Sequence, residues 1–165
     1  MSKPKTVTRL PKIDLSHIYE IMKPINWRKR EGLNNRCGFP PYRGAIFGMV
    51  RPRKNSGQIC LSLDSKRHPE IYEELMQLGK AIVPFEFNSI QVNRNLVCPP
   101  HKDKHNVGDS LLISFGDYTG GEIMVEGKKY NAFHKPVIFN GSQHEHWNLP
   151  IDGDKFSLVF FKMVW

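Results

Sequence analysis

The second half of this chain is divided into short apolar or alternating runs, and this pattern limits the possible folds more than any other feature. From residue 86 onward, clusters of Gly, Asn and Pro separate these runs. Such runs are typical of β-strands joined by tight turns, and many of them together predict a sandwich or a jelly roll. The expected strands cover 86–92, 110–115, 122–125, 129–133, 136–139 and 156–164, with two earlier ones at 45–50 and 58–63.

Two helical patterns lie in the first half of the chain. Residues 14–22 repeat apolar side chains at helical spacing, and residues 69–78 do so between Pro69 and Gly79. Proline at the first helical position and glycine after the last are frequent helix boundaries. The expected fold class is therefore mainly β with flanking helices, an α+β arrangement. Its last strand, 156–164, is apolar nearly throughout and should be central or covered on both faces.

A chain of 165 residues fits one domain and can bury a core without disulfide bonds. Residues 1–12 are polar and rich in Pro and Lys, so we expect a loose basic arm there. Residues 13–165 should form a single domain and a monomer. Within that domain, 13–85 is a basic helix and strand part, and 86–165 is the jelly-roll core.

The three cysteines are scattered, which argues against a disulfide framework and against a structural zinc site. A reducing compartment inside the cell is the simplest setting, and the sequence does not distinguish cytoplasm from nucleus. We expect no membrane span and no secretory signal, because no long apolar run is present.

The positive charge is concentrated in the first third of the chain. Residues 1–60 hold 13 Lys and Arg against 3 Asp and Glu, whereas residues 61–165 hold 11 against 13. This asymmetry suggests a polyanionic partner, with nucleic acid as the first candidate. A solvated basic face that aids solubility is the alternative explanation.

A possible metal site begins at His101-Lys102-Asp103. On a strand, residues two apart point to the same side, so this imidazole and carboxylate can reach one ion. A second histidine from a distant strand would complete a 2-His-1-carboxylate face with open positions opposite. That arrangement is typical of non-haem Fe(II) oxygenases. The triplet alone is weak evidence, since a short motif of this form often occurs by chance.

The segment FNGSQHEHWNLP offers two candidates for the distant histidine, His144 and His146. Reading His144-Glu145-His146 as a single ligand motif would leave Asp103 without a role. The next strand carries Lys155 and Ser157 two residues apart. An ammonium group and a hydroxyl so placed can bind a carboxylate.

Residues 90–161 resemble the 2-oxoglutarate/Fe(II)-dependent dioxygenases, and more narrowly the TET/JBP group that oxidises methyl groups of nucleic-acid bases. The elements that carry the resemblance are the N-x-N at Asn93 and Asn95, the H-x-D-x-x-N from His101 to Asn106, Ser110, the S-F-G-x-x-x-G-G of 114–121 and the F-N-G-S before the distal histidine. The resemblance implies a double-stranded β-helix, or jelly roll, as the fold of a catalytic domain.

The same resemblance implies Fe(II), 2-oxoglutarate and O₂ as cofactor and cosubstrates. In this group the distal histidine lies four residues before a proline, which favours His146 over His144 as the third ligand beside His101 and Asp103. Lys155 and Ser157 would then bind the distal carboxylate of 2-oxoglutarate, with Asn93 as a further contact. The group usually carries Arg where this chain has Lys155. Lysine can still bind the carboxylate, but through a single ammonium group rather than through the paired N–H groups of a guanidinium. The chain also lacks the cysteine-rich zinc region of animal members.

The implied reaction is hydroxylation of the methyl group of 5-methylcytosine or thymine in nucleic acid. DNA is favoured over RNA, but the sequence does not distinguish the two. The substrate residues expected from the group's pattern and from position are Asn106, which in that pattern contacts the base, with His105 and Asn95. Phosphate contacts are expected from basic residues near the N-terminus, namely Arg43, Arg51, Arg53 and Lys54, and Tyr42 could stack on a base. The rival hypotheses are a protein hydroxylase, for example a prolyl hydroxylase, a small-molecule hydroxylase, and a non-catalytic jelly-roll binding module.

Overall fold

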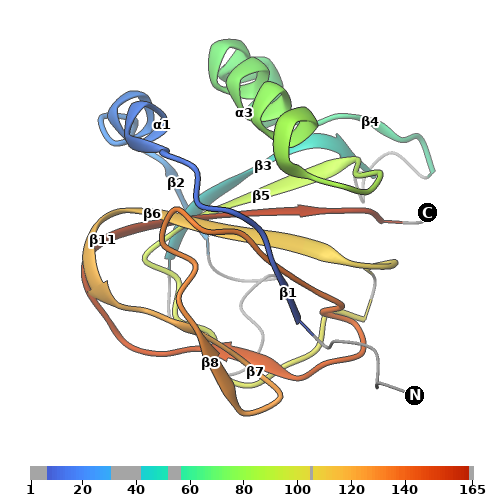
Figure 1. Ribbon diagram of the computed structural model, residues 1–165. Helices are drawn as coiled ribbons and strands as arrows, with labels where there is room; N and C mark the ends of the chain where they lie inside the picture. Colours follow the sequence, from blue (N-terminus) through green and yellow to red (C-terminus); the bar gives the residue numbers. More distant parts are fainter. Residues whose placement is uncertain (1–6, 31–41, 52–56, 105, 164–165) are drawn as a thin grey trace.

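The computed structural model describes residues 7–30, 42–51, 57–104 and 106–163. Figure 1 shows three layers: helices above, a large sheet in the middle and a small sheet below. The fold is mainly β with few helices, as expected. The large sheet has the order β1-β9-β6-β11-β5-β3-β2, with β4 paired to β3, and the small sheet has the order β10-β7-β8. Their ladders are antiparallel.

The strands of the large sheet are β1 Val7–Arg9, β2 Arg28–Arg30, β3 Tyr42–Val50, β4 Cys60–Leu61, β5 Ser89–Arg94, β6 Ser110–Gly120, β9 Val137–Phe139 and β11 Ile151–Phe161. Those of the small sheet are β7 Ile123–Val125, β8 Lys128–Tyr130 and β10 His146–Asn148. The helices are α1 Ser16–Met22, α2 Leu63–Arg67 and α3 Pro69–Ile82. Within the described part of the chain, no helix is long and apolar enough to cross a bilayer.

Strand β11 lies between β6 and β5, which confirms the central position expected for the apolar run at the end of the chain. Its side chains alternate between two environments. Phe156, Leu158 and Phe160 are fully buried in the main hydrophobic core, which α1 and α3 cover. Lys155, Ser157 and Val159 fall on the opposite face by alternation, toward the small sheet. The central strand therefore has an apolar face toward the helices and a face of mixed polarity toward the small sheet.

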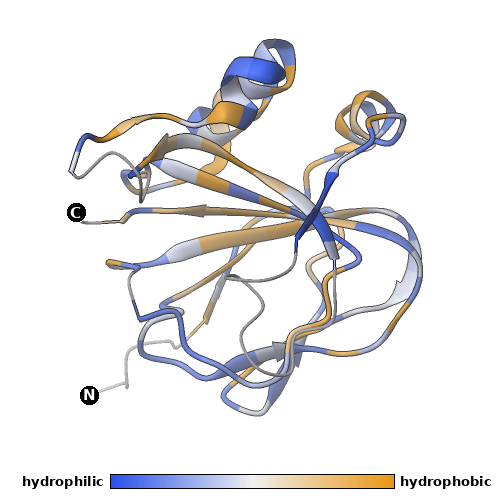
Figure 2. Ribbon diagram, turned by 180° about the vertical axis from the view of Figure 1, so that it is seen from behind, coloured by the Kyte–Doolittle hydropathy of each residue, from blue (hydrophilic) through white to orange (hydrophobic). Residues whose placement is uncertain are grey.

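A second, smaller hydrophobic core lies on the small-sheet side. It contains Leu112 of β6, Ile123 and Val125 of β7, and Val137 and Phe139 of β9. Figure 2 shows the long strands of the large sheet coloured mainly as hydrophobic and the lower layer with more hydrophilic positions. This small apolar cluster packs the two sheets together, and polar side chains lie beside it.

Two expectations about local structure are wrong. Residues 7–9 were expected in a loose arm, but they form β1, whose backbone pairs with β9 through Val7 and Phe139. Helix α3 begins at Pro69 as expected but continues past Gly79 to Ile82. Gly79 does not end the helix. A Cβ at this position would lie 2.4 Å from Cζ of Phe87, so glycine allows the helix to pack closely on the sheet.

Several elements extend beyond the sequence expectation because pairing continues through polar residues. Strand β11 begins at Ile151 rather than 156, and its register places Ile151 opposite Gly120 of β6. The short elements β2, β10 and α2 carry no clear periodicity and were not expected. Strand β10 matters most, since it begins at His146.

Candidate metal centre and its pocket

The backbone brings His101 and His146 together from distant parts of the chain. The two residues form an isolated antiparallel bridge and exchange both N–H to O=C bonds, each 3.0 Å long. The N–H of Asp103 donates to the carbonyl of Gly141 at 2.8 Å. Main-chain bonds therefore join the segment at 101–103 to the segment at 141–146, and both histidines and the aspartate project from this junction.

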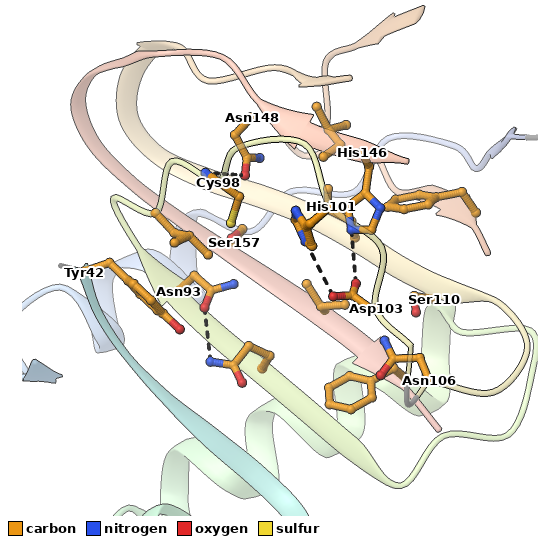
Figure 3. A pocket seen from close by; sticks show the side chains of 17 residues that line it. Tyr42, Asn93, Cys98, His101, Asp103, Asn106, Ser110, His146, Asn148 and Ser157 are labelled. Atoms are coloured by element: carbon orange, nitrogen blue, oxygen red, sulfur yellow. Dashed lines mark hydrogen bonds and ion pairs between the residues drawn. The ribbon is translucent and has the colours of Figure 1, made fainter. Parts of the chain in front are cut away.

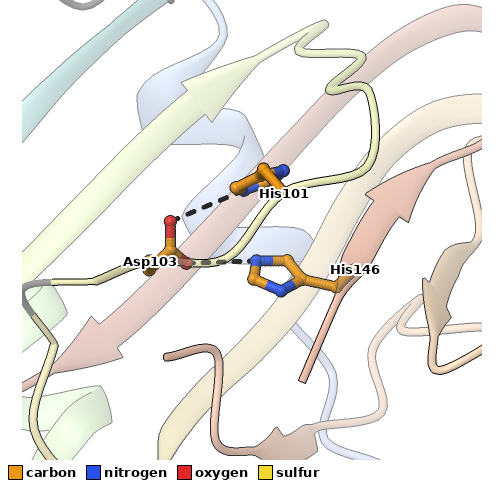
Figure 4. A group of neighbouring side chains, drawn as sticks. All are labelled: His101, Asp103 and His146. Carbon is orange, nitrogen blue, oxygen red and sulfur yellow. Dashed lines mark hydrogen bonds and ion pairs between the residues drawn. The ribbon is translucent and has the colours of Figure 1, made fainter. Parts of the chain in front are cut away.

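The side chains of these three residues converge, as Figure 4 shows. Nε2 of His146 lies 3.1 Å from Oδ2 of Asp103, and Nε2 of His101 lies 3.5 Å from Oδ1. The two imidazole centroids are 4.3 Å apart. All three ligand atoms lie within 4.8 Å of one another, close enough to bind one ion. Two imidazoles and one carboxylate are the ligand set of non-haem Fe(II) sites.

The other nitrogen of each histidine ring is held by the main chain. Nδ1 of His101 lies 2.8 Å from the carbonyl oxygen of Pro99, and Nδ1 of His146 lies 2.9 Å from that of His144. A carbonyl oxygen only accepts, so Nδ1 carries a proton in both rings, and Nε2 would present its lone pair once a metal replaces its contact with Asp103. Contacts of this kind fix the tautomer and the ring orientation of metal ligands.

Asp103 is suited to act as an anionic ligand. Burial alone would raise the pKa of its carboxyl group, but hydrogen bonds with His101 and His146 outweigh burial and hold the pKa well below its usual range. The carboxylate is therefore charged at neutral pH. His144 does not take part, because its ring lies 3.3 Å from Oε1 of Glu126 instead. The geometry thus favours His146 as the third ligand, as expected.

Gly141 lies directly against this cluster, and we expect Gly141→Ala to weaken metal binding. A Cβ at this position would lie 3.1 Å from Oδ2 of Asp103 and 3.2 Å from Cε1 of His146. Both side chains would have to shift by a few tenths of an ångström. Disturbing groups that orient metal ligands typically costs about 10- to 100-fold in affinity. Anaerobic Fe(II) titration measures this loss, and a thermal melt of the metal-free protein checks the fold. Unchanged affinity would show that the ligands tolerate displacement.

A pocket with apolar walls and several polar groups opens beside the three ligands, and Figure 3 shows the side chains that line it. The cavity measures about 220 Å³. Its lining comes from both sheets and from the loop that carries Asp103: Tyr42, Gln91, Asn93, Leu96, Cys98, His101, Asp103, Asn106, Ser110, Leu112, Ile123, Phe139, His146, Asn148, Ser157, Val159 and Phe161. A mixed lining of apolar walls and a few polar groups is typical of small-ligand sites.

One wall of this pocket carries two of the residues expected to bind a cosubstrate. Ser157 of β11 and Asn93 of β5 are paired across neighbouring strands, and both are buried. Nε2 of Gln91 donates to Oδ1 of Asn93 at 3.1 Å, which leaves the Asn93 amide nitrogen for a ligand. Because side chains alternate along β11, Lys155 lies on the same face as Ser157.

Lys155 is buried and does not itself line the pocket. Its Nζ donates to the carbonyl of Gly121 at 2.6 Å, and the residue is only 3% exposed. No carboxylate forms an ion pair with it among the described residues. Burial lowers the pKa of Lys155 to about 8, and the nearby Cys98 and Glu122 oppose this effect only in part. A buried cation with no counter-ion is a site at which an anion can be stabilised.

The expected substrate residues are dispersed. Asn106 lines the pocket beside the ligands. Asn95 lies outside it, and its Oδ1 accepts the backbone N–H of Lys155 at 2.8 Å. Arg43 is near the start of β3, whereas Arg51 follows the opposite end of that strand. His105, Arg53 and Lys54 lie outside the described residues.

Several pocket residues were not among the expected site residues. Gln91 precedes Asn93 by two positions, so strand alternation could have indicated it. Ser110 is buried at the start of β6, and its hydroxyl has no hydrogen-bond partner among the described residues. Cys98 reaches the pocket from a loop and Asn148 from the end of β10, and the N–H of Asn148 donates to the carbonyl of Cys98. No sequence periodicity marks either position.

Comparison of the sequence alone finds no matching family model and no matching curated protein. Comparison of the structure does find similar folds. NgTET1, solved in complex with 5mC DNA, has a TM-score of 0.63 at 16% identity, covering 96% of this chain and 72% of that one. A 2OG-Fe(II) oxygenase family oxidoreductase from Burkholderia pseudomallei has a TM-score of 0.60 at 17% identity, covering 94% and 84%.

Two further matches widen the range of similar structures. OsALKBH1 has a TM-score of 0.62 at 14% identity, covering 98% of this chain and 100% of that one. The viral collagen prolyl hydroxylase from Paramecium Bursaria Chlorella virus-1, solved as a 2OG complex, has a TM-score of 0.53 at 13% identity, covering 98% and 97%. The chain therefore has the double-stranded β-helix fold of the 2OG-Fe(II) oxygenases, and in it His101, Asp103 and His146 form a cluster of facial-triad composition.

Proposed function

We propose that this protein is an Fe(II)- and 2-oxoglutarate-dependent dioxygenase. The observation that carries the proposal is the convergence of two Nε2 atoms and one carboxylate in the lining of this pocket. Both imidazoles are already oriented by main-chain carbonyls, so binding a metal would require little rearrangement. When bound, Fe(II) would supply the oxidative chemistry with O₂, and 2-oxoglutarate would provide two of the electrons.

The protein's own groups hold and orient the reactants. His101, Asp103 and His146 would occupy one face of the metal and leave the opposite face open to the pocket. The apolar walls contributed by Leu112, Ile123 and Phe139 restrict water around that open face. A dry, shaped site strengthens the electrostatic interactions inside it and limits side reactions.

Lys155, Ser157 and Asn93 would hold the distal carboxylate of 2-oxoglutarate. The buried ammonium supplies the charge, while the hydroxyl and the amide supply hydrogen bonds from the pocket wall. In the structure without ligand, Lys155 donates to the carbonyl of Gly121. An entering carboxylate would give this ammonium group a charged partner in addition to that carbonyl.

For the substrate, we propose the methyl group of 5-methylcytosine or thymine in nucleic acid. The excess positive charge in residues 1–60 supports a polyanion, and Asn106 lies in the pocket, where an amide can bind a base edge. The similarity to NgTET1, which was solved with 5mC DNA, supports the same substrate class. A base within a duplex would have to be flipped out to reach the pocket.

The experiment that tests this function supplies Fe(II), ascorbate and 2-oxoglutarate together with a panel of substrates. The panel contains 5-methylcytosine DNA, thymine DNA, methylated RNA and a proline-rich peptide. Mass spectrometry of nucleosides and peptides detects the oxidised product, and succinate is measured in parallel. We expect an oxidised base in nucleic acid. Hydroxyproline without any oxidised base would assign the same pocket to a protein hydroxylase, and no succinate with any substrate would reject the enzyme altogether.

A further inference from the structure

A groove lined by arginine side chains leads away from the metal pocket. It consists of two adjoining cavities of about 450 Å³ and about 390 Å³. Both are lined by Asn26, Trp27 and Arg43, so they form one continuous hollow at the β2 edge of the large sheet. Tyr42 lines both the metal pocket and the nearer cavity. The groove runs on the helix side of the large sheet, where Arg94 lies over Phe156, and among the described residues it shares Tyr42 with the lining of the candidate active site.

The groove has an excess of positive charge. Arg94 lines the nearer cavity, and Arg28 and Arg67 line the farther one, with Arg43 common to both. Two carboxylates also line it, but each already binds an arginine. Asp154 binds Arg94 at 2.8 Å and Asp64 binds Arg28 at 3.0 Å.

Arg43 and Arg67 supply the unbalanced charge. Both are exposed, and no carboxylate forms an ion pair with either among the described residues. Arg43 makes one hydrogen bond, from Nη1 to the carbonyl of Trp27 at 2.8 Å, which positions its guanidinium at the junction of the two cavities. Strand β2 of the same edge is Arg-Lys-Arg in sequence and is strongly hydrophilic in Figure 2.

We propose that this groove, which we name the arginine groove, binds the phosphodiester backbone of the nucleic-acid strand whose target base enters the metal pocket past Tyr42. A guanidinium group binds a phosphate through paired hydrogen bonds. Because Tyr42 lines both cavities, the phosphates that flank the target base would contact Arg43 first and Arg67 next. This proposal rests on the proposed function, because it takes nucleic acid as the substrate.

The test is the salt dependence of binding by metal-free protein, which allows no turnover. The variant Arg43→Gln/Arg67→Gln removes both unbalanced charges. The control Lys80→Gln/Lys135→Gln removes two exposed charges that lie outside both cavities. Fluorescence anisotropy with a labelled single-stranded oligonucleotide is measured over a series of salt concentrations, with duplex DNA and polyglutamate as further probes.

For single strands, each phosphate contact contributes about −0.7 to the slope of log K against log salt. We expect the slope of the arginine variant to be about 1.4 less negative than that of the parent. The lysine control should keep the parental slope. Equal slopes for the two variants would overturn the proposal. Equal loss of polyglutamate binding would overturn it too, in favour of an acidic peptide.

Succinate formation without nucleic acid separates this proposal from the proposed function. The lysine control should form succinate at the parental rate, because neither lysine lines the metal pocket or the arginine groove. If no base is ever oxidised but the slope changes as expected, the arginine groove is supported and the proposed base oxidation fails. If bases are oxidised but the slope does not change, the arginine groove is wrong and the proposed function stands.

Discussion

His146→Ala should abolish Fe(II) binding and succinate formation, while His144→Ala should leave both close to the parental level. Loss of groups that only orient metal ligands already costs about 10- to 100-fold, so loss of a ligand should cost more than about 100-fold in metal affinity. His146 presents Nε2 to Asp103 at 3.1 Å, whereas the ring of His144 lies against Glu126. Anaerobic Fe(II) titration and a succinate assay measure the two effects.

His144→Ala is a matched control because His144 lies only two residues before His146, in the loop that leads into β10. The carbonyl of His144 that orients the His146 ring belongs to the main chain, so it survives the substitution. A thermal melt of both variants without metal shows whether the fold is intact. If His144→Ala lost iron as completely as His146→Ala, the ligand assignment would be wrong.

Lys155→Met should raise the KM for 2-oxoglutarate strongly, and Lys155→Arg should restore much of the loss. Removing one partner of a buried charge pair costs about 2–5 kcal/mol, which corresponds to at least about 30-fold in affinity. Lys155 is only 3% exposed, and its ammonium group forms no ion pair with a carboxylate among the described residues. Steady-state kinetics with varied 2-oxoglutarate measure this effect. Parental KM in Lys155→Met would exclude Lys155 from the cosubstrate site.

The pH dependence of cosubstrate use should identify the same lysine. Only the charged ammonium attracts a carboxylate, and burial lowers the pKa of Lys155 to about 8. The kcat/KM for 2-oxoglutarate should therefore fall as pH rises through about 8, and in Lys155→Arg this fall should disappear. The ring of Tyr118 lies 5.8 Å from Nζ, but burial raises its pKa to about 12, so it stays neutral in this range. Cys98 and Glu122 also act on this lysine, and both remain in the variant.

The lowered pKa of Lys155 also affects the stability of the fold, which should rise with pH where kcat/KM for 2-oxoglutarate falls. The pKa of Lys155 is lower in the folded protein than in the unfolded chain, so burial penalises the charged form. The penalty is fully present below about pH 8 and disappears as pH rises toward the unfolded pKa. Without 2-oxoglutarate, Lys155→Met should therefore unfold at a higher temperature than the parent at pH 7. The difference should shrink at higher pH, and a differential scanning experiment at several pH values would detect it.

The sequence determined the strand-rich core and the types of ligand. The spacing of His101 and Asp103 placed two ligands on one side of the chain, because that geometry is local. The apolar run that became β11 predicted a central strand, since such a strand must be covered on both faces. Alternation along it also placed Lys155 and Ser157 on one face before any contact was known.

The tertiary structure decided what depends on contacts between distant segments. The sequence favoured His146 over His144 only through the resemblance, by its spacing to a proline. The physical reason is the backbone bridge from His146 to His101, which joins residues 45 positions apart. Gly79 was misread as a helix end because its true constraint is the ring of Phe87 on another element. The arginine groove likewise combines Arg28, Arg43 and Arg67 from β2, β3 and α2. Local spacing determines which side chains share a face, whereas only the packed sheets determine which faces meet.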